Sequence, residues 1–198
     1  VRAVSGFAGN LRESEGQLVE SDGGDAWYVR PIVLDTLAGH EPPDVLAVSS
    51  ALMDSPRHAA WALDDGTGAF HSLTDVRALE RFAGSLQGLS GLGWATLVAV
   101  VLGPSGAERV MDSDDTVESL FQELAPRIPA DQRPLELDSN SEGWRLRFLS
   151  ARLAAEGDDP IFRISARRWN VRFVDGRLDV SSRLIVDRAV LERYRAGP

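Results

Sequence analysis

Short apolar runs separated by glycine-bearing turns dominate the pattern of this chain. Residues 59–63 and 69–73 are two such runs, and Asp64-Asp65-Gly66-Thr67-Gly68 lies between them. This arrangement predicts a β-hairpin. Residues 74–86 follow with apolar side chains at helical spacing, which predicts a helix with one apolar face. The pattern therefore indicates a hairpin followed by a helix.

The same order recurs twice further along the chain. The expected strand, return strand and helix lie at residues 94–102, 107–111 and 116–124, and then at residues 171–174, 177–184 and 186–194. Asp175-Gly176 is a signal for a tight turn in the last of these hairpins. We therefore predict an α+β fold, with antiparallel sheet built from hairpin-then-helix units and helices packed on one face.

Polarity and turn residues suggest how the chain is divided. Residues 1–26 are polar and read as an N-terminal arm, and residues 27–125 hold the first two hairpin-helix units. Residues 126–134 contain three prolines and read as a linker. Residues 135–198 are expected to form an antiparallel sheet with a C-terminal helix. We expect this sheet to pack on the preceding region as one compact unit.

The segment after the linker alternates between large apolar residues and arginine. Trp144, Leu146 and Phe148 alternate with Arg145 and Arg147. This period of two predicts a half-buried strand whose outer face carries arginine.

The next predicted strand, residues 161–174, changes phase along its length. Phe162, Ile164 and Ala166 share one face, whereas Trp169, Val171 and Phe173 share the other. A slip of one residue moves every following side chain to the opposite face. We therefore predict a bulge or bend near Arg167-Arg168.

Composition excludes several kinds of chemistry. The 198 residues include no cysteine, so disulfides, thiol catalysis and cysteine-ligated zinc are excluded. All 21 basic residues are arginine, so a phosphate-binding loop of the kind that needs lysine is excluded as well. Residues 1–141 hold 22 acidic residues against 9 arginines, a net of -13, whereas residues 142–198 hold 8 against 12, a net of +4.

No catalytic, metal or cofactor motif is specific enough to assign. His71 lies beside Ser72 but on a predicted hairpin, without the turn that positions a nucleophile. Asp112-Ser113-Asp114-Asp115 reads as an acidic helix start rather than a calcium loop. Gly88, Gly91 and Gly93 precede a predicted strand, whereas a dinucleotide fingerprint opens a helix. We therefore expect no metal and no cofactor.

Arginine and aromatic residues of the C-terminal part form the one candidate binding surface. They are Arg145, Arg147, Arg168, Trp169 and Arg172. Guanidinium groups on one sheet face suit a small anionic ligand or an acidic protein partner. The alternatives are a solvated face, or arginines that pair with the acidic remainder of the chain. The net charge of -9 argues against nucleic acid.

The leading hypothesis is a non-catalytic binding or regulatory protein, and a homodimer is left open. The alternative is a carboxylate-dependent hydrolase with a cleft between the hairpin-helix units, because 30 carboxylates conceal any catalytic pair. The longest apolar run has nine residues, whereas about 20 are needed to span a bilayer. No leader is visible, so we expect a cytoplasmic protein without a membrane segment. Removal of a leader is the alternative, because the chain does not begin with Met.

Overall fold

Two units make up the chain in this computed structural model. They comprise residues Val1–Gly106 and Ala107–Pro198, and each is described by itself. The structure describes residues 17–20, 26–41, 43–50, 58–64, 69–83, 86, 88–104, 108–111, 135–156 and 161–190.

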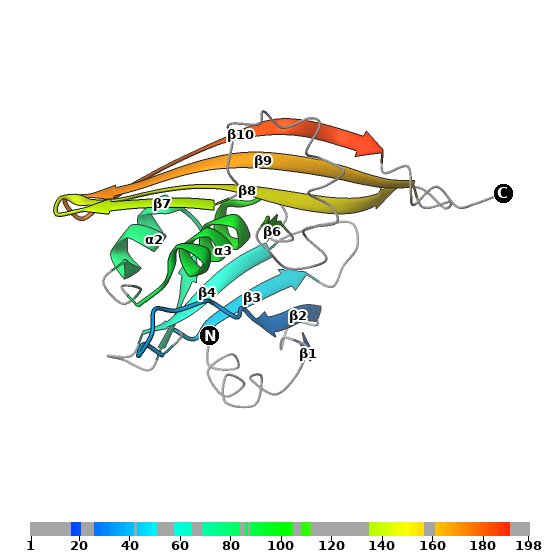
Figure 1. The fold of residues 1–198 in the computed structure, drawn as a ribbon. Coiled ribbons are helices and arrows are strands. Elements are labelled where there is room, and N and C mark those ends of the chain that lie inside the picture. Colours follow the sequence, from blue (N-terminus) through cyan, green and yellow to red (C-terminus); the bar gives the residue numbers. More distant parts are fainter. Residues whose placement is uncertain are drawn as a thin grey trace. The chain divides into compact units, whose positions relative to one another are not determined.

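The first unit contains a five-stranded antiparallel meander in which each strand pairs with its neighbour in the sequence. Its strands are β1 (Gln17–Glu20), β2 (Ala26–Pro31), β3 (Val45–Ser50), β4 (His58–Asp64) and β5 (Ala69–Leu73), and Figure 1 shows them in blue to cyan. The hairpin predicted around residues 64–68 is therefore confirmed as β4 and β5.

Helix α2 (Val76–Phe82) follows this hairpin, as the apolar spacing predicts, although it is shorter than expected. Asp75 caps the helix, because its side chain accepts a hydrogen bond of 2.8 Å from the backbone N–H of Ala78. Ala78 and Leu79 are buried, which accounts for the apolar face. The sequence signals at this helix therefore agree with its structure.

Helix α3 (Gly91–Leu102) corrects the sequence analysis, which predicts a strand at residues 94–102. Buried residues lie on all sides of α3, so its sequence has no polar stripe. A helix without a polar stripe and a fully buried strand leave the same continuous apolar run in a sequence. Gly91 and Gly93 belong to the first turn of this helix, so the expectation that they precede a strand is also wrong.

Hydrogen bonds join the loop after β2 to the start of α3. The Ser90 hydroxyl accepts a hydrogen bond of 3.1 Å from the Gly93 backbone N–H and donates one to the Asp35 carboxylate. The Ser90 backbone N–H also donates to the Asp35 carbonyl oxygen at 3.1 Å. A Cβ atom at Gly93 would lie 2.1 Å from that carbonyl oxygen. Only glycine allows the loop to approach the helix this closely.

The second unit is a five-stranded antiparallel sheet. Its strands are β6 (Arg109–Val110), β7 (Leu135–Asn140), β8 (Gly143–Glu156), β9 (Ile161–Val174) and β10 (Arg177–Val190). Strands β10, β9 and β8 lie side by side, and β6 and β7 pair with different parts of β8 along its other edge (Figure 1). Asp175 and Gly176 join β9 to β10 with φ values of 53° and 75°, as the predicted two-residue turn requires.

The predicted α+β fold with helices packed on one face is wrong, because antiparallel strands dominate the structure. The described residues contain two helices, and both belong to the first unit. The helix expected from residue 186 is absent up to Val190, because β10 continues to that residue and pairs with β9. Pairing along the long strand β9 therefore overrides the helical spacing at the end of the sequence.

Some expectations fall outside the described residues. These include the linker at residues 126–134, the helix at residues 116–124 and most of the polar arm, in which only β1 is described. The expected domain boundaries stay predictions, although the contacts of the chain divide at Gly106. Within the described residues, neither helix has the length and apolar character needed to cross a membrane.

Replacing Gly93 with alanine tests the close approach of the loop to α3. An alanine within a helix ordinarily stabilises a protein by up to about 1 kcal/mol relative to glycine. At Gly93 the added methyl group meets the Asp35 carbonyl oxygen, so we expect a loss of about 2 kcal/mol, the cost of overpacking. Denaturant unfolding measures the change. Thr96→Ala in the same helix is the control and should leave the unfolding free energy nearly unchanged. A Gly93→Ala variant as stable as the parent protein would contradict the close approach of the Asp35 carbonyl oxygen to Gly93.

Candidate anion-binding face

The pairing of β8 with β9 determines which side chains share a face. It runs without a register shift from Gly143 opposite Val174 to Glu156 opposite Ile161. Residues directly opposite each other in an antiparallel pair project to the same side, and successive residues alternate. Each residue in this ladder can therefore be assigned to one of two faces.

The buried face changes part-way along the sheet. Trp169 and Val171 are buried in one half of β9, and Ile164 and Ala166 are buried in the other. These two pairs project to opposite faces, so the apolar surface moves from one face of the sheet to the other. The sequence predicts this change of phase correctly.

The predicted bulge lies in a different strand from the one expected. The β8–β9 ladder is uninterrupted at Arg167-Arg168. The register shifts in the β9–β10 ladder instead, between Leu184 opposite Arg167 and Val186 opposite Ala166. The extra residue belongs to β10, so β9 keeps its alternation and the change of buried face is real.

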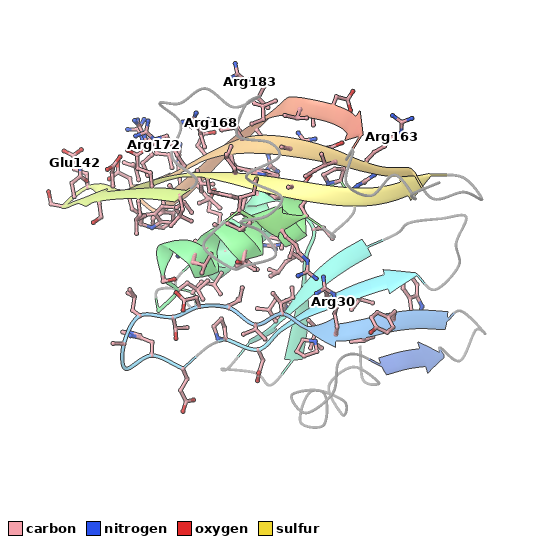
Figure 2. The ribbon with its side chains drawn as sticks, turned by 45° about the vertical axis from the view of Figure 1, so that its right-hand side comes forward. Arg30, Glu142, Arg163, Arg168, Arg172 and Arg183 are labelled. Atoms are coloured by element: carbon pink, nitrogen blue, oxygen red, sulfur yellow. The ribbon has the colours of Figure 1, made fainter. Side chains whose placement is uncertain are left out.

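Six arginines project from one face where the opposite face is buried. They are called the arginine face here and comprise Arg145, Arg147, Arg168, Arg172, Arg177 and Arg183. The first four are candidates from the sequence, and Arg183 joins them because it pairs with Arg168. Figure 2 shows Arg168, Arg172 and Arg183 extending from the same side of the sheet.

Two pairs of arginines lie directly opposite each other across neighbouring strands. Arg145 faces Arg172 between β8 and β9, and Arg168 faces Arg183 between β9 and β10. Like charges in this arrangement destabilise a sheet, because Cβ atoms of opposite residues are only about 4.5–5.5 Å apart. Within the described part of the chain, no carboxylate forms an ion pair with any of these four arginines.

Arg147 is the member of the arginine face that pairs internally. Its guanidinium lies 2.8 Å from a Glu136 carboxylate oxygen and 3.5 Å from an Asp138 oxygen, both on β7. All three side chains are partly exposed, so each ion pair stabilises the sheet by about 1 kcal/mol or less. Internal pairing thus accounts for one arginine of the face and leaves the two arginine–arginine pairs unexplained.

A shallow groove of about 430 Å³ lies on the arginine face. It is lined by Arg147, Arg168, Asn170, Ser181, Ser182 and Arg183. Guanidinium, amide and hydroxyl groups all donate hydrogen bonds, and none of the described residues in this lining is a carboxylate. The groove therefore offers several donors and net positive charge to an anion.

A second concavity, of about 300 Å³, lies at the β7–β8 turn end of the sheet. Its lining includes Arg145 and Arg172 together with the carboxylates Asp138 and Glu142. The mixture of charges makes it a poorer place for an anion than the groove. Arg145 and Arg172 thus border carboxylates, whereas Arg168 and Arg183 line a surface with cationic and neutral groups.

Trp169 differs from the other sequence candidates, because it lies on the opposite, buried face. Only 2% of its surface is exposed, and its ring stacks on Phe148 with centroids 5.8 Å apart. Its indole N–H donates a hydrogen bond of 2.8 Å to the Ser150 hydroxyl. The arginine surface is consequently not an arginine and aromatic surface, and Trp169 supports it from beneath.

A buried polar network surrounds Trp169, and the sequence analysis does not find it. The Ser150 hydroxyl donates to the Glu108 carboxylate at 2.5 Å, and Arg167 Nε lies 3.5 Å from the other Glu108 oxygen. The Arg167 guanidinium also lies 5.8 Å from the centre of the Trp169 ring. Glu108 is only 8% exposed, and a lone acidic residue next to Arg109 carries no sequence signal of this role.

Arg167 therefore has a structural role that separates it from Arg168. It projects to the face of Trp169, where it pairs with Glu108 and donates a hydrogen bond of 3.2 Å to the Ser182 hydroxyl. This network lies where the buried surface changes face, and it gives hydrogen-bond partners to the Trp169 indole, the Ser150 hydroxyl and the Glu108 carboxylate.

The hydrolase alternative assumes a cleft between hairpin-helix units, and two of the three units do not form as expected. The second hairpin-helix unit begins with helix α3 instead of a strand, and the third continues as β10 where its helix was expected. In the ranges that the structure describes, no three His, Asp or Glu side chains are grouped so as to hold a metal ion.

The comparisons with known proteins found no matching family model, curated protein or solved structure.

Removing the Ser150 hydroxyl tests the buried network. Ser150→Ala leaves the Trp169 N–H without its acceptor and removes the hydroxyl donor to Glu108, so we expect a loss of about 2 kcal/mol in unfolding free energy. Ser181→Ala is the control, because Ser181 is exposed on the same sheet. Equal denaturant midpoints for the two variants would show that the network contributes nothing.

Proposed function

We propose that this protein is a non-catalytic binding or regulatory protein whose arginine face captures an anionic group. The arginine–arginine pairs support this proposal most directly. Arg168 opposite Arg183 costs free energy in the unliganded sheet, and both residues line the groove. An anion between them replaces repulsion with attraction, so binding of a ligand relieves this cost.

Phosphate and carboxylate groups share the chemistry that fits this groove. Both accept paired hydrogen bonds from the planar guanidinium group of arginine. Asn170 and Ser181 add neutral donors beside the cations. We propose a compact anion, either on a small molecule or on an acidic segment of a partner protein. An extended polyanion fits less well, because the chain as a whole carries a net charge of -9.

Calorimetric titration with inorganic pyrophosphate tests the proposal. A reference titration with sodium chloride of equal ionic strength measures the effect of salt alone, because any salt screens exposed charges. We expect Arg168→Gln to weaken pyrophosphate binding about tenfold or more, since a hydrogen bond to a charged group stabilises by about 1.5–3 kcal/mol. Arg77→Gln makes the same charge change on α2 and should bind like the parent protein.

A peptide of alternating aspartate and serine distinguishes the two sources of the anion. Binding of the peptide but not of pyrophosphate would assign the face to a protein partner, and the reverse would assign it to a small molecule. Equal affinities of the Arg168→Gln and Arg77→Gln variants for both probes would contradict the proposed function, as would failure of the parent protein to bind either probe.

A further inference from the structure

Strand β10 forms one edge of the second sheet. It pairs with β9, and no other described strand pairs with it. Its first eight residues, 177–184, pair with β9 in constant register, and the shifts begin after Leu184. A regular strand edge presents backbone donors and acceptors that can pair with another strand, whereas bulges hinder such pairing. The regular half of β10 is therefore the part suited to a further strand.

The charges along this regular half are arranged symmetrically about Ser181. Asp179 lies two residues before Ser181 and Arg183 lies two residues after it. All three side chains are exposed, and the period of two places them on the same face of the sheet. An antiparallel copy of this strand, related by a two-fold axis at Ser181, would present opposite charges at both positions.

We propose that a second copy of this chain pairs with the outer edge of β10 around a two-fold axis at Ser181. Asp179 then lies opposite the partner's Arg183, and Arg183 lies opposite the partner's Asp179. A two-fold interface uses the same surface on both copies, so a single complementary pair is formed twice. The two sheets join into one continuous antiparallel sheet.

The backbone geometry of β10 agrees with this register. The two-residue turn at Asp175-Gly176 makes Arg177 a hydrogen-bonded partner of Val174. Hydrogen-bonded and non-hydrogen-bonded pairs then alternate, so Val180 and Ser182 direct their backbone groups away from β9. Val180 pairs with the partner's Ser182 in the proposed register. Asp179 and Arg183 occupy the non-hydrogen-bonded positions, where opposite side chains are closest.

Apolar contact on the other face supports the same register. Leu184 is 42% exposed and projects from the face opposite the arginines. In the proposed dimer its side chain lies opposite the partner's Leu178, which is itself buried in its own sheet. Pairing thus covers an apolar side chain that the single chain leaves in water.

Neighbouring two-fold registers lack this complementarity. Moving the axis to Val180 places Arg177 opposite the partner's Arg183, which sets like charges against each other. Moving it to Ser182 places Arg183 opposite the partner's Ser181 and leaves Asp179 opposite a residue beyond the regular half. The charge pattern therefore selects Ser181 as the axis.

Pairing through β10 does not rest on the anion-binding proposal, but it changes the surface on which a ligand would bind. The arginine faces of both copies lie on the same side of the joined sheet. The partner's Asp179 neutralises Arg183, and Arg172 already lies opposite Asp179 of its own chain, whereas Arg168 stays available to a ligand. A ligand with two anionic groups could then contact both copies.

Charge reversal tests the dimer through its symmetry. Arg183→Glu gives two acids at each facing pair, and Asp179→Arg gives two cations. Each variant alone should sediment as a monomer, with self-association weakened at least about tenfold. An equimolar mixture should form a heterodimer, because all facing charges are then opposite. A mixture that stays monomeric, or variants that dimerise alone like the parent chain, would overturn the proposal.

Cysteine trapping gives a second measurement that does not depend on changing charges. The chain has no cysteine, so a Ser181→Cys variant carries one thiol, located at the proposed axis. Oxidation should yield a covalent dimer, since opposite residues at a non-hydrogen-bonded pair lie within disulfide range. Asn170→Cys is the control, because Asn170 is exposed on β9, one strand further from the edge. Equal cross-linking of the two variants would contradict a two-fold axis at Ser181.

Discussion

Uninterrupted pairing between β8 and β9 is the constraint on which the second unit depends. Fourteen residues of each strand keep one register, so every side chain has a fixed face. Because the hydrophobic pattern changes phase while the pairing does not, the buried surface must move from one face to the other. The arginines are exposed opposite the buried Trp169 and Val171 as a direct consequence.

Buried polar groups accompany the change of face. Glu108, Ser150, Trp169 and Arg167 lie together where one buried surface ends and the other begins. An apolar residue in place of Arg167 would leave the carboxylate of Glu108 without its cation, and removing one partner of a buried ion pair is costly. The network and the arginine face are thus two results of one arrangement.

Local pattern in the sequence predicts much of this sheet but not the global fold. Alternation at residues 144–148 and the phase change before Trp169 are visible because each depends on neighbouring residues. Arg183 and Glu108 are missed because their roles depend on pairing between strands distant in sequence. Helix α3 is missed because burial on all sides removes the polar stripe, and the end of β10 is missed because pairing with β9 outweighs a helical pattern.

Cross-strand proton contacts in an NMR spectrum test the central claim of continuous register most directly. In a regular antiparallel ladder, Hα protons meet at alternate pairs, where Cα atoms are about 4.5 Å apart. The account predicts contacts between Arg147 and Asn170 and between Ala151 and Ala166, on both sides of Arg168. A contact of Ala151 with Ser165 or Arg167 instead would place a bulge in this ladder and move Ala166 from the face of the arginines to the face of Trp169.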